Sequence, residues 1–515
     1  MNLISPTPHL AVNKILDRFL ANIKDILKNQ FVGMYLFGSL ANGDFDQYSD
    51  IDVLVVTDGE ISSDTFSALK EMHAQINTID SPWAIQLEVS YIPQNALRYF
   101  DPNDKLHPHM DRGTDEVLHM KSHESDWIIQ RHLLRERGIE ITGPALKSLI
   151  DPVAPSELRQ AVIDELPLWS EYLLQHSSSL KSRGYQSFCV LSFCRMLYTL
   201  QNKGVLSKPM AAAWAMQTLD LRWRPLIERA LVGRQNPELE ASPEEVNETL
   251  EMLRYIVACS DQPSIFPDVN ELLSQLLTNV KEILKDQFIG MYLYGSLSSG
   301  EFNPKSSDID FLVITDGQLP DEMIGELEAM HKQTWATNFK RAGQLEGAYV
   351  PNDLIRHHEP SGASCPAVNE GQFYVAGLGS DWIIQRHVVR EYGVVLEGPD
   401  PKTLIDPVSP DEIRGAVMGI LREWWFPMLE DPAWLRDHER GYRAFAVITM
   451  CRALHALENG TIASKPRAVQ WAQASLEDNW QPLIDQAMAS SNHENPDVPL
   501  GETLDFIRYV YEKVK

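Results

Sequence analysis

The chain has 515 residues, of which 44% are hydrophobic, and a formal net charge of −27 from 72 acidic and 45 basic side chains; it is longer than one hydrophobic core usually grows, so several domains are expected. This charge repels polyanions over a Debye length of about 8 Å and argues against nucleic acid as a partner. The longest apolar runs, such as VLVV and FLVI, are far shorter than the roughly 20 residues that cross a bilayer, so no membrane partner is expected.

The cellular setting is suggested by the N-terminus and the cysteines. MNLISPTPHLAVNKILDRFL has no basic start followed by an uninterrupted apolar stretch, so we expect no secretory signal. None of the five cysteines has CxxC spacing, which indicates reduced thiols and a cytoplasmic protein. Cys189, Cys194 and Cys451 lie among apolar residues and are expected in the core.

The first half of the chain changes texture partway along. Short β-branched and aromatic runs predict strands at residues 31–37, 51–57 and 85–92, and they alternate with helices predicted at 8–29 and 62–77. From about Asp126 the strand signals end and long helical patterns follow. The predicted order is therefore an α/β module and then an all-helical module, with a ligand cleft expected between them.

The second half repeats the first along almost its whole length. FVGMYLFGSL at 31–40 returns as FIGMYLYGSL at 288–297, and SDWIIQRHLLRERG at 125–138 returns as SDWIIQRHVVREYG at 380–393. A period this long indicates two tandem copies of one complete unit. Turn formers near residues 259–268 mark the seam. The expected domains are, in chain order, 1–123, 124–262, 263–378 and 379–515.

Acidic residues on two strands give each copy a candidate metal site. Asp50 and Asp52 project from one strand face about 6–7 Å apart, where they repel by roughly 2–3 kcal/mol at an effective dielectric near 20. Glu88 alternates with apolar neighbours on another predicted strand, so three carboxylates can converge. Oxygen ligands of this kind suit Mg²⁺, one or two per site, with substrate phosphates completing the coordination. The corresponding acids of the second copy are Asp308, Asp310 and Glu346.

A glycine and a serine end the first strand of each copy. Gly38 permits close approach of the backbone, and Ser39 can cap a helix whose N–H groups receive phosphate. Gly295 and Ser296 repeat the pair. Gly-Ser after a strand is common, and a lone Asp-x-Asp can merely flank a loop. The fixed spacing to a third strand-borne acid favours a metal-nucleotide site.

Together these residues resemble the nucleotidyltransferase superfamily typified by DNA polymerase beta, with its Gly-Ser followed by Asp-x-Asp. Both copies are more closely similar to the aminoglycoside adenylyltransferases, especially the streptomycin/spectinomycin branch. The resemblance runs from GMYLFGSL through RWRPLIERAL at 222–231 and NWQPLIDQAM at 479–488. It implies, in each half, a small mixed-sheet nucleotidyltransferase domain followed by a helical-bundle domain. It also implies AMP transfer from Mg-ATP to a drug hydroxyl, with release of pyrophosphate.

The resemblance assigns roles to residues of both modules. It implies that Glu88 and Glu346 act as general bases, and that Ser49 and Ser307 join the Gly-Ser pairs at the nucleotide. It further implies closure of the helical domain over the triphosphate by Arg195, Lys208 and Tyr255, repeated as Arg452, Lys465 and Tyr509. A solvated lysine, an internal ion pair of Arg195 and ordinary packing of the tyrosines are the alternatives.

Two further features qualify the assignment. Trp127, Arg131 and His132, repeated as Trp382, Arg386 and His387, are expected to pack the first helix of the helical module rather than to do chemistry. The drug-modifying branch has an acidic residue ten positions before the helix arginine, where this chain has Tyr185 and Tyr442.

The leading hypothesis is a tandem adenylyltransferase that uses ATP and a small polar hydroxyl acceptor. Protein AMPylation, as in toxin-antitoxin nucleotidyltransferases, is a second hypothesis, and a nucleotide-sensing protein without turnover is a third. The acidic charge would attract a small polycation, although it can also serve only solubility. Tandem copies can imitate a homodimer, so a monomer with pseudo-two-fold packing of the copies is one expectation.

Overall fold

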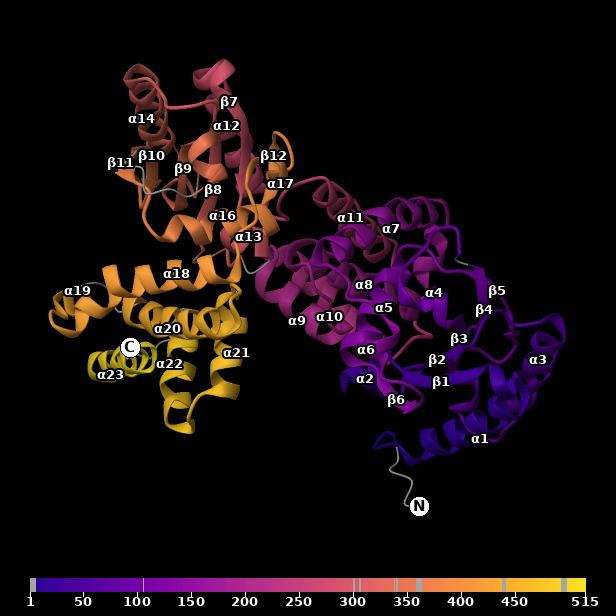
Figure 1. The fold of residues 1–515 in the computed structure, drawn as a ribbon. Helices are drawn as coiled ribbons and strands as arrows, with labels where there is room; N and C mark the ends of the chain where they lie inside the picture. Colours follow the sequence, from indigo (N-terminus) through magenta and orange to yellow (C-terminus); the bar gives the residue numbers. More distant parts are fainter. Residues whose placement is uncertain are drawn as a thin grey trace. The chain divides into compact units, whose positions relative to one another are not determined.

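The chain forms two compact units, Met1–Ile265 and Phe266–Lys515, called here the first and the second copy (Figure 1). The computed structural model describes residues 6–104, 106–299, 302–304, 307–337, 339, 341–357, 364–437, 441–491 and 498–515. Residues 1–5, the start of the N-terminal stretch discussed above, lie outside the described residues. No helix in these ranges is long and apolar enough to cross a membrane.

The first copy begins with a six-stranded mixed sheet of order β5-β4-β3-β2-β1-β6. Its strands are β1 Phe31–Leu36, β2 Ile51–Thr57, β3 Leu87–Pro93, β4 Leu106–Met110, β5 His119–Ser122 and β6 Ile139–Thr142. Its helices are α1 Leu10–Leu27, α2 Gly38–Asn42, α3 Ser63–Asn77, α4 Gln94–Arg98, α5 Asp126–Arg137 and α6 Leu146–Leu149. Only β2 and β3 pair in parallel; the other neighbouring strands are antiparallel.

The strict alternation of β2 divides its side chains between two cores. Val53 and Val55 pack with α1 and α3 on one face of the sheet, and Leu54 and Val56 pack with α5 and α6 on the other. Because side chains alternate along a strand, Asp52 belongs to the α5 face. The hydrophobic pattern thus decides which way the acid points.

The helical module of the first copy is built around a long, largely buried α8. Its helices are α7 Pro155–Gln175, α8 Arg183–Asn202, α9 Lys208–Thr218, α10 Arg224–Gly233 and α11 Pro243–Ser260. Helix α8 contacts the other four. Cys189 and Cys194 are buried in it, and Cys451 is buried in the equivalent helix of the second copy. All five cysteines are free thiols. The burial of Cys189, Cys194 and Cys451 confirms that they are core residues.

The second copy repeats this architecture, with a sheet of order β11-β10-β9-β8-β7-β12. Its strands are β7 Phe288–Leu293, β8 Ile309–Thr315, β9 Leu345–Pro351, β10 Ser364–Asn369, β11 Gln372–Gly377 and β12 Val394–Glu397. Around the sheet lie α12 Pro267–Leu284, α13 Gly295–Ser299, α14 Asp321–Ala336, α15 Asn352–Arg356, α16 Asp381–Tyr392 and α17 Pro401–Leu404. The helical module contains α18 Pro410–Ile420, α19 Ala433–Asp437, α20 Gly441–Asn459, α21 Lys465–Ser475, α22 Gln481–Ser491 and α23 Leu500–Val514.

The structure confirms the duplicated α/β and all-α fold. The strands and helices predicted from the sequence of the first half agree closely with β1 to β3, α1 and α3. The expectation that strands end before Asp126 is wrong, because β6 follows α5 and pairs with β1, and β12 does the same in the second copy. These four-residue strands lie at a sheet edge, too short to show a period-two pattern. The domain limits at 123/124 and 378/379 stay predictions.

A buried histidine gives both units a predicted sensitivity to acid. His73 Nε2 lies 2.7 Å from the Tyr91 hydroxyl, and His331 repeats the contact with Tyr349 at 2.7 Å. Burial lowers the pKa of His73 to about 3 and that of His331 to about 4. The unfolded chain protonates near pH 6.5 and the folded one does not, so stability is full above that pH and falls as the pH drops toward 4.

We therefore expect His73→Gln to make the acid loss of stability shallower, by at most about 1.4 kcal/mol per pH unit. Urea unfolding followed between pH 7 and 5 measures this slope. His176→Gln, at an exposed histidine of the same copy, is the control and should leave the slope unchanged. Equal slopes for His73→Gln and the unaltered chain would contradict the prediction.

Candidate active site

Three carboxylates of the first copy meet where β2 begins. Asp52 on β2 lies directly opposite Glu88 on β3 in the parallel pair, and Asp50 immediately precedes β2. One oxygen from each of the three side chains lies within 4.8 Å of the other two. The structure therefore brings the predicted acids together, on the face of the sheet that carries α5.

The second copy repeats the register, since Asp310 on β8 lies opposite Glu346 on β9. Burial raises the pKa of both, and Asp308 is close enough for its charge to add to the rise. This trio is more open than the first, because among the described residues its ligand atoms do not form a group with all separations within 4.8 Å.

Crowding of like charges perturbs both trios. Burial, followed by the charges of Asp50 and Glu88, holds the pKa of Asp52 well above its usual range. Burial and the charge of Glu346 raise the pKa of Asp310 to about 8. Such carboxylates are costly to keep ionised side by side without a cation. Perturbed groups in a cleft are typical of functional sites.

The loop after β1 provides the second part of the site. Gly38 has φ +63°, and a Cβ there would collide with the Asp52 carboxylate. Ser39 Oγ is buried and has no hydrogen-bond partner among the described residues. Ser49 Oγ accepts from the backbone N–H of Asp46 at 3.0 Å, which shapes the loop leading into β2. Glycine is thus required where the loop approaches the acids most closely.

The second copy has the same arrangement. Gly295 has φ +62°, and a Cβ there would collide with Asp310. Ser296 Oγ is again buried without a partner among the described atoms. Ser307 Oγ accepts from the backbone N–H of Asn303 at 2.9 Å. The two loops therefore present the same unpaired hydroxyl beside the same acid.

A cleft of about 800 Å³ separates the sheet from the helical module in the first copy, and the trio and both loop serines line it. Arg195 and Lys208 line the helical side. Lys208 Nζ lies 4.3 Å from the centre of the Phe188 ring. Burial and the nearby Arg195 charge lower the pKa of Lys208 to about 8, while Asp50 and Asp52 oppose that shift. Burial also lowers the pKa of Arg195.

The equivalent cations of the second copy are placed alike. Lys465 Nζ lies 5.8 Å from the centre of the Phe445 ring, and its charge acts to lower the pKa of Asp308 and Asp310. Arg452 Nε donates to the Ala463 carbonyl at 3.3 Å. In each copy the lysine is the first residue of one helix of the helical module, and the arginine lies within another.

Tyr255 is not among the residues that line the first-copy cleft, and both predicted tyrosines make packing contacts. The Tyr255 hydroxyl donates to the Ile265 carbonyl at 2.8 Å, and its ring lies 5.5 Å from that of Trp223. Tyr509 lies 5.2 Å from the Trp480 ring. These contacts favour the packing alternative for both residues.

The shared Trp-x-x-x-Arg-His motif has a packing role, as expected. Trp127 and Arg131 are buried. Arg131 Nε donates to the Leu97 carbonyl at 2.9 Å, and another guanidinium nitrogen donates to the Arg98 carbonyl. These are orphan carbonyls at the end of α4, so the arginine ties α5 to that helix. Arg386 makes the same contact with the Ile355 carbonyl at 2.7 Å.

Sequence reasoning missed several residues that line the cleft. Arg112 lies with NH1 3.4 Å from Asp50 Oδ2. The backbone N–H of Asp126 donates to Glu165 Oε1 at 3.1 Å, and Arg234 lies 3.3 Å from Asp46. Asp126 belongs to the repeated SDWIIQRH segment, a signal that could have identified it. Arg112 and Arg234 lie in segments without a recognisable motif.

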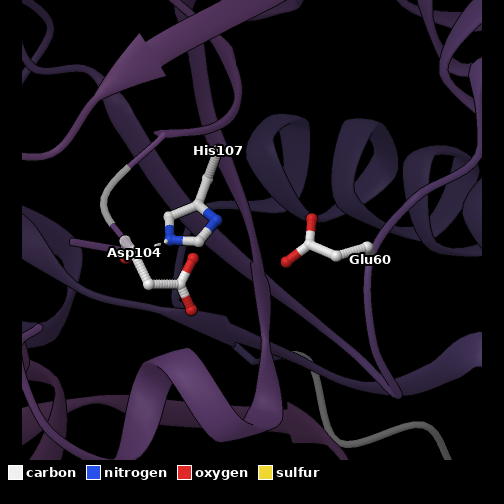
Figure 2. A group of neighbouring side chains, drawn as sticks. All are labelled: Glu60, Asp104 and His107. Atoms are coloured by element: carbon white, nitrogen blue, oxygen red, sulfur yellow. Dashed lines mark hydrogen bonds between the residues drawn. The ribbon is translucent and has the colours of Figure 1, made fainter.

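Another group of potential ligands lies away from the cleft (Figure 2). Glu60, Asp104 and His107 offer ligand atoms within 4.8 Å of one another, and His107 Nε2 lies 3.2 Å from the Asp104 carbonyl. Both carboxylates are exposed, and Glu60 follows the far end of β2 from Asp50. This group is therefore separate from the cleft acids.

The donor set of the cleft fits a hard divalent cation. Three carboxylates converge, burial and the neighbouring charges raise the pKa of Asp52 and of Glu88, and an unpaired serine hydroxyl lies beside the glycine loop. Oxygen-only ligands of this kind suit Mg²⁺. Asp50, Asp52 and Glu88 would hold the ion.

The acids lie where two parallel strands begin, and they face cations on a helical module across the cleft. This arrangement is typical of enzymes that transfer nucleotidyl groups. The nucleotidyltransferase domain family matches residues 20–102 and 273–354, and the aminoglycoside adenylyltransferase C-terminal domain family matches 148–258 and 403–511. These matches together span well over half of the chain. The chain belongs to the aminoglycoside adenylyltransferase family of nucleotidyltransferases and contains two tandem copies of it.

Relatives have the length of about one copy. A spectinomycin 9-adenylyltransferase of Staphylococcus aureus is 28% identical over 220 residues, which are 41% of this chain and 80% of the relative. An aminoglycoside (3'') (9) adenylyltransferase of Escherichia coli is 25% identical over 242 residues, 43% of this chain and 86% of the relative. A spectinomycin adenyltransferase structure from Enterococcus faecialis, with ATP and spectinomycin, is 20% identical with a TM-score of 0.38, covering 48% of this chain and 98% of that chain.

The glycine loop yields a matched pair of substitutions. Gly38→Ala should weaken Mg-ATP binding to the first copy by roughly tenfold or more, because the new Cβ displaces Asp52. Gly43→Ala is the control: its φ is also positive, at +77°, but a Cβ there meets nothing within 4 Å. Calorimetry in an Asp308→Asn background, which weakens the second site, measures the difference. Equal effects of the two substitutions would show that backbone strain alone matters.

Proposed function

We propose that the chain is a magnesium-dependent adenylyltransferase that transfers AMP from ATP to a hydroxyl of an aminoglycoside-like small molecule and releases pyrophosphate. The observation that carries the proposal is the convergence of Asp50, Asp52 and Glu88 within 4.8 Å, next to an unpaired serine hydroxyl and opposite Arg195 and Lys208. A triphosphate needs both the cation held by the acids and the basic side chains.

The residues of the chain divide the work between nucleotide and acceptor. Ser39 and the N–H groups at the start of α2 face the phosphates, and Lys208 and Arg195 neutralise them from the helical side. Bound magnesium would orient the phosphates and offset their charge. Ser49 contributes by fixing the loop that carries Asp50.

Glu88 is the proposed general base. The acceptor oxygen attacks the α-phosphorus and forms the new O–P bond, while the bond from that phosphorus to the bridging oxygen of pyrophosphate breaks. The hydroxyl proton passes to the Glu88 carboxylate. A base held at this position contributes about 10²–10⁴-fold.

The acceptor class is supported by the relatives. Those described above are named as spectinomycin or aminoglycoside adenylyltransferases, and this chain covers at least 80% of their length. The cleft of about 800 Å³ also has room for an acceptor beside the nucleotide. A small molecule, rather than a polypeptide, is therefore the proposed acceptor.

A binding role without turnover is a second candidate for the second copy alone. The observation favouring it is the more open trio of Asp308, Asp310 and Glu346. In this case the second copy would hold ATP and the first would perform the transfer. The two single-site variants described next distinguish the candidates.

Pyrophosphate release, screened with ATP, GTP and CTP against a panel of aminoglycosides and uncharged polyhydroxy compounds, tests the proposal. If both copies turn over, Asp50→Asn and Asp308→Asn each retain part of the ATP-dependent rate, and the double variant loses at least about 10²-fold. If only one copy turns over with a given acceptor, the Asp→Asn change in the other copy is silent and the change in the working copy abolishes release. Absence of nucleotide-dependent release with every acceptor would refute the function.

The proposed base gives a sharper kinetic signature. In an Asp308→Asn background, Glu88→Gln should lower kcat by about 10²–10⁴-fold. Because Gln keeps the shape and retains an oxygen ligand, the affinity for Mg-ATP should change far less. Steady-state rates and calorimetry on the same preparation separate the two effects. A matched loss of ATP affinity would mean that Glu88 serves the metal rather than the proton.

A further inference from the structure

The two copies differ beside the acids, on the strand next to the one that carries the third carboxylate. The residue after that carboxylate pairs with Met110 on β4 in the first copy and with Val368 on β10 in the second. These two residues are therefore equivalent. Two positions further along the chain lie Arg112 in the first copy and Glu370 in the second. The same place carries opposite charges.

In the first copy, two cations lie near the trio. Arg112 lines the cleft and lies 3.4 Å from Asp50. Lys121 on β5 is the second cation. Burial and the charges of Asp50 and Asp111 raise the pKa of Glu88, and the charges of Lys121 and Arg112 act to lower it. Positive charge thus reaches the carboxylate where the acceptor hydroxyl must lie.

Lys121 is held by a network that only the first copy has. Its Nζ lies 2.7 Å from Asp111 Oδ1 and 3.0 Å from His109 Nε2. His109 Nδ1 lies 2.9 Å from the Ser90 hydroxyl. Strand pairing places non-ionisable residues at the equivalent positions of the second copy, which are Ala348, Ala367, Asn369 and Ala376.

In the second copy, Glu370 adds a negative charge to the same region. Burial raises the pKa of Asp308 and of Glu346. The charge of Glu370 adds to the rise for Asp308, and the charges of Asp308 and then Glu370 add to the rise for Glu346. The Glu370 carboxylate accepts from the Tyr442 hydroxyl at 2.9 Å. Tyr442 belongs to α20 of the helical module, so Glu370 reaches from the sheet toward the opposite side of the site.

We propose that the two copies bind acceptors of different charge: the second copy binds polycationic acceptors beside Glu370, whereas Arg112 and Lys121 exclude them from the first and leave it to uncharged hydroxyl acceptors. This proposal rests on the proposed function, in which each site takes a hydroxyl acceptor. Its physical basis is that opposite charges attract and like charges repel most strongly in a partly enclosed cleft. One duplicated scaffold then serves two substrate classes.

Binding stoichiometry tests this directly. The full chain is saturated with Mg²⁺ and a non-hydrolysable ATP analogue and titrated with streptomycin, a polycation, in a calorimeter. We expect one tight equivalent per chain. Glu370→Arg should weaken it by roughly ten- to hundredfold, the effect of one or more lost charge-assisted contacts. Arg112→Glu combined with Lys121→Ala should add a second equivalent.

Matched controls separate local from overall charge. Lys14→Glu with Lys70→Ala makes the same net change as the first-copy pair, at exposed residues outside the cleft lining. Glu322→Arg, at an exposed residue of α14, matches Glu370→Arg. Both controls should leave one equivalent with unchanged affinity. Retained binding of the ATP analogue shows that each variant is folded.

Each outcome bears on the proposal. Two equal equivalents or none in the unaltered chain, or unchanged affinity in Glu370→Arg, would overturn it, as would failure of the first-copy pair to gain an equivalent. Pyrophosphate release is scored separately. If the stoichiometry follows the prediction but no acceptor supports release, the discrimination stands and the catalytic function fails. If release occurs in both copies with the same acceptor preference, the catalytic function stands and the discrimination fails.

Discussion

The parallel pairing of β2 with β3 is the constraint on which the site depends. It makes both strands begin at the same edge of the sheet and sets Asp52 opposite Glu88. A slip of one residue would turn the acids toward the α1 and α3 core and the apolar residues toward the cleft. Val53 and Val55, buried on the other face, oppose that slip. Burial of ordinary aliphatic side chains thus holds together carboxylates that repel one another.

This repulsion explains why the sheet needs the helical module. Lys208 begins α9, where a cation opposes the helix dipole, and Arg195 is enclosed in the largely apolar α8. Without a nearby negative charge, neither the start of a helix nor an apolar helix favours a cation. Facing Asp50 and Asp52 across the cleft, each set of charges reduces the cost of the other, which is visible in the opposing influences on the pKa of Lys208. A polyphosphate with its metal complements both sets at once.

Much of this was predictable because it depends on local pattern. The alternation of apolar residues around Asp52 and Glu88, the glycine before Ser39 and the repetition of all of them identified the trio and the loop. The short strands β4, β5 and β6 were not predictable, since four or five residues give no clear periodicity. Tyr255 was assigned from the resemblance alone; its ring contacts Trp223, and its role at the nucleotide stays a prediction. Arg112 was missed because its position is defined only by the pairing of β4 with β3.

The same contrast explains where the two copies diverge. Replacing Asp52 or Gly38 disturbs a register or a close approach, so both copies keep these residues. Arg112 and Glu370, beyond the ends of β4 and β10, are exposed residues near the acids that do not support the core, and a change of charge there leaves the sheet intact. Arg112 and Glu370 occupy such positions, as do Lys121 and Ala376 on the edge strands. These charge differences therefore lie where we propose that the acceptor binds, while the acids and cations proposed to face the nucleotide are the same in both copies.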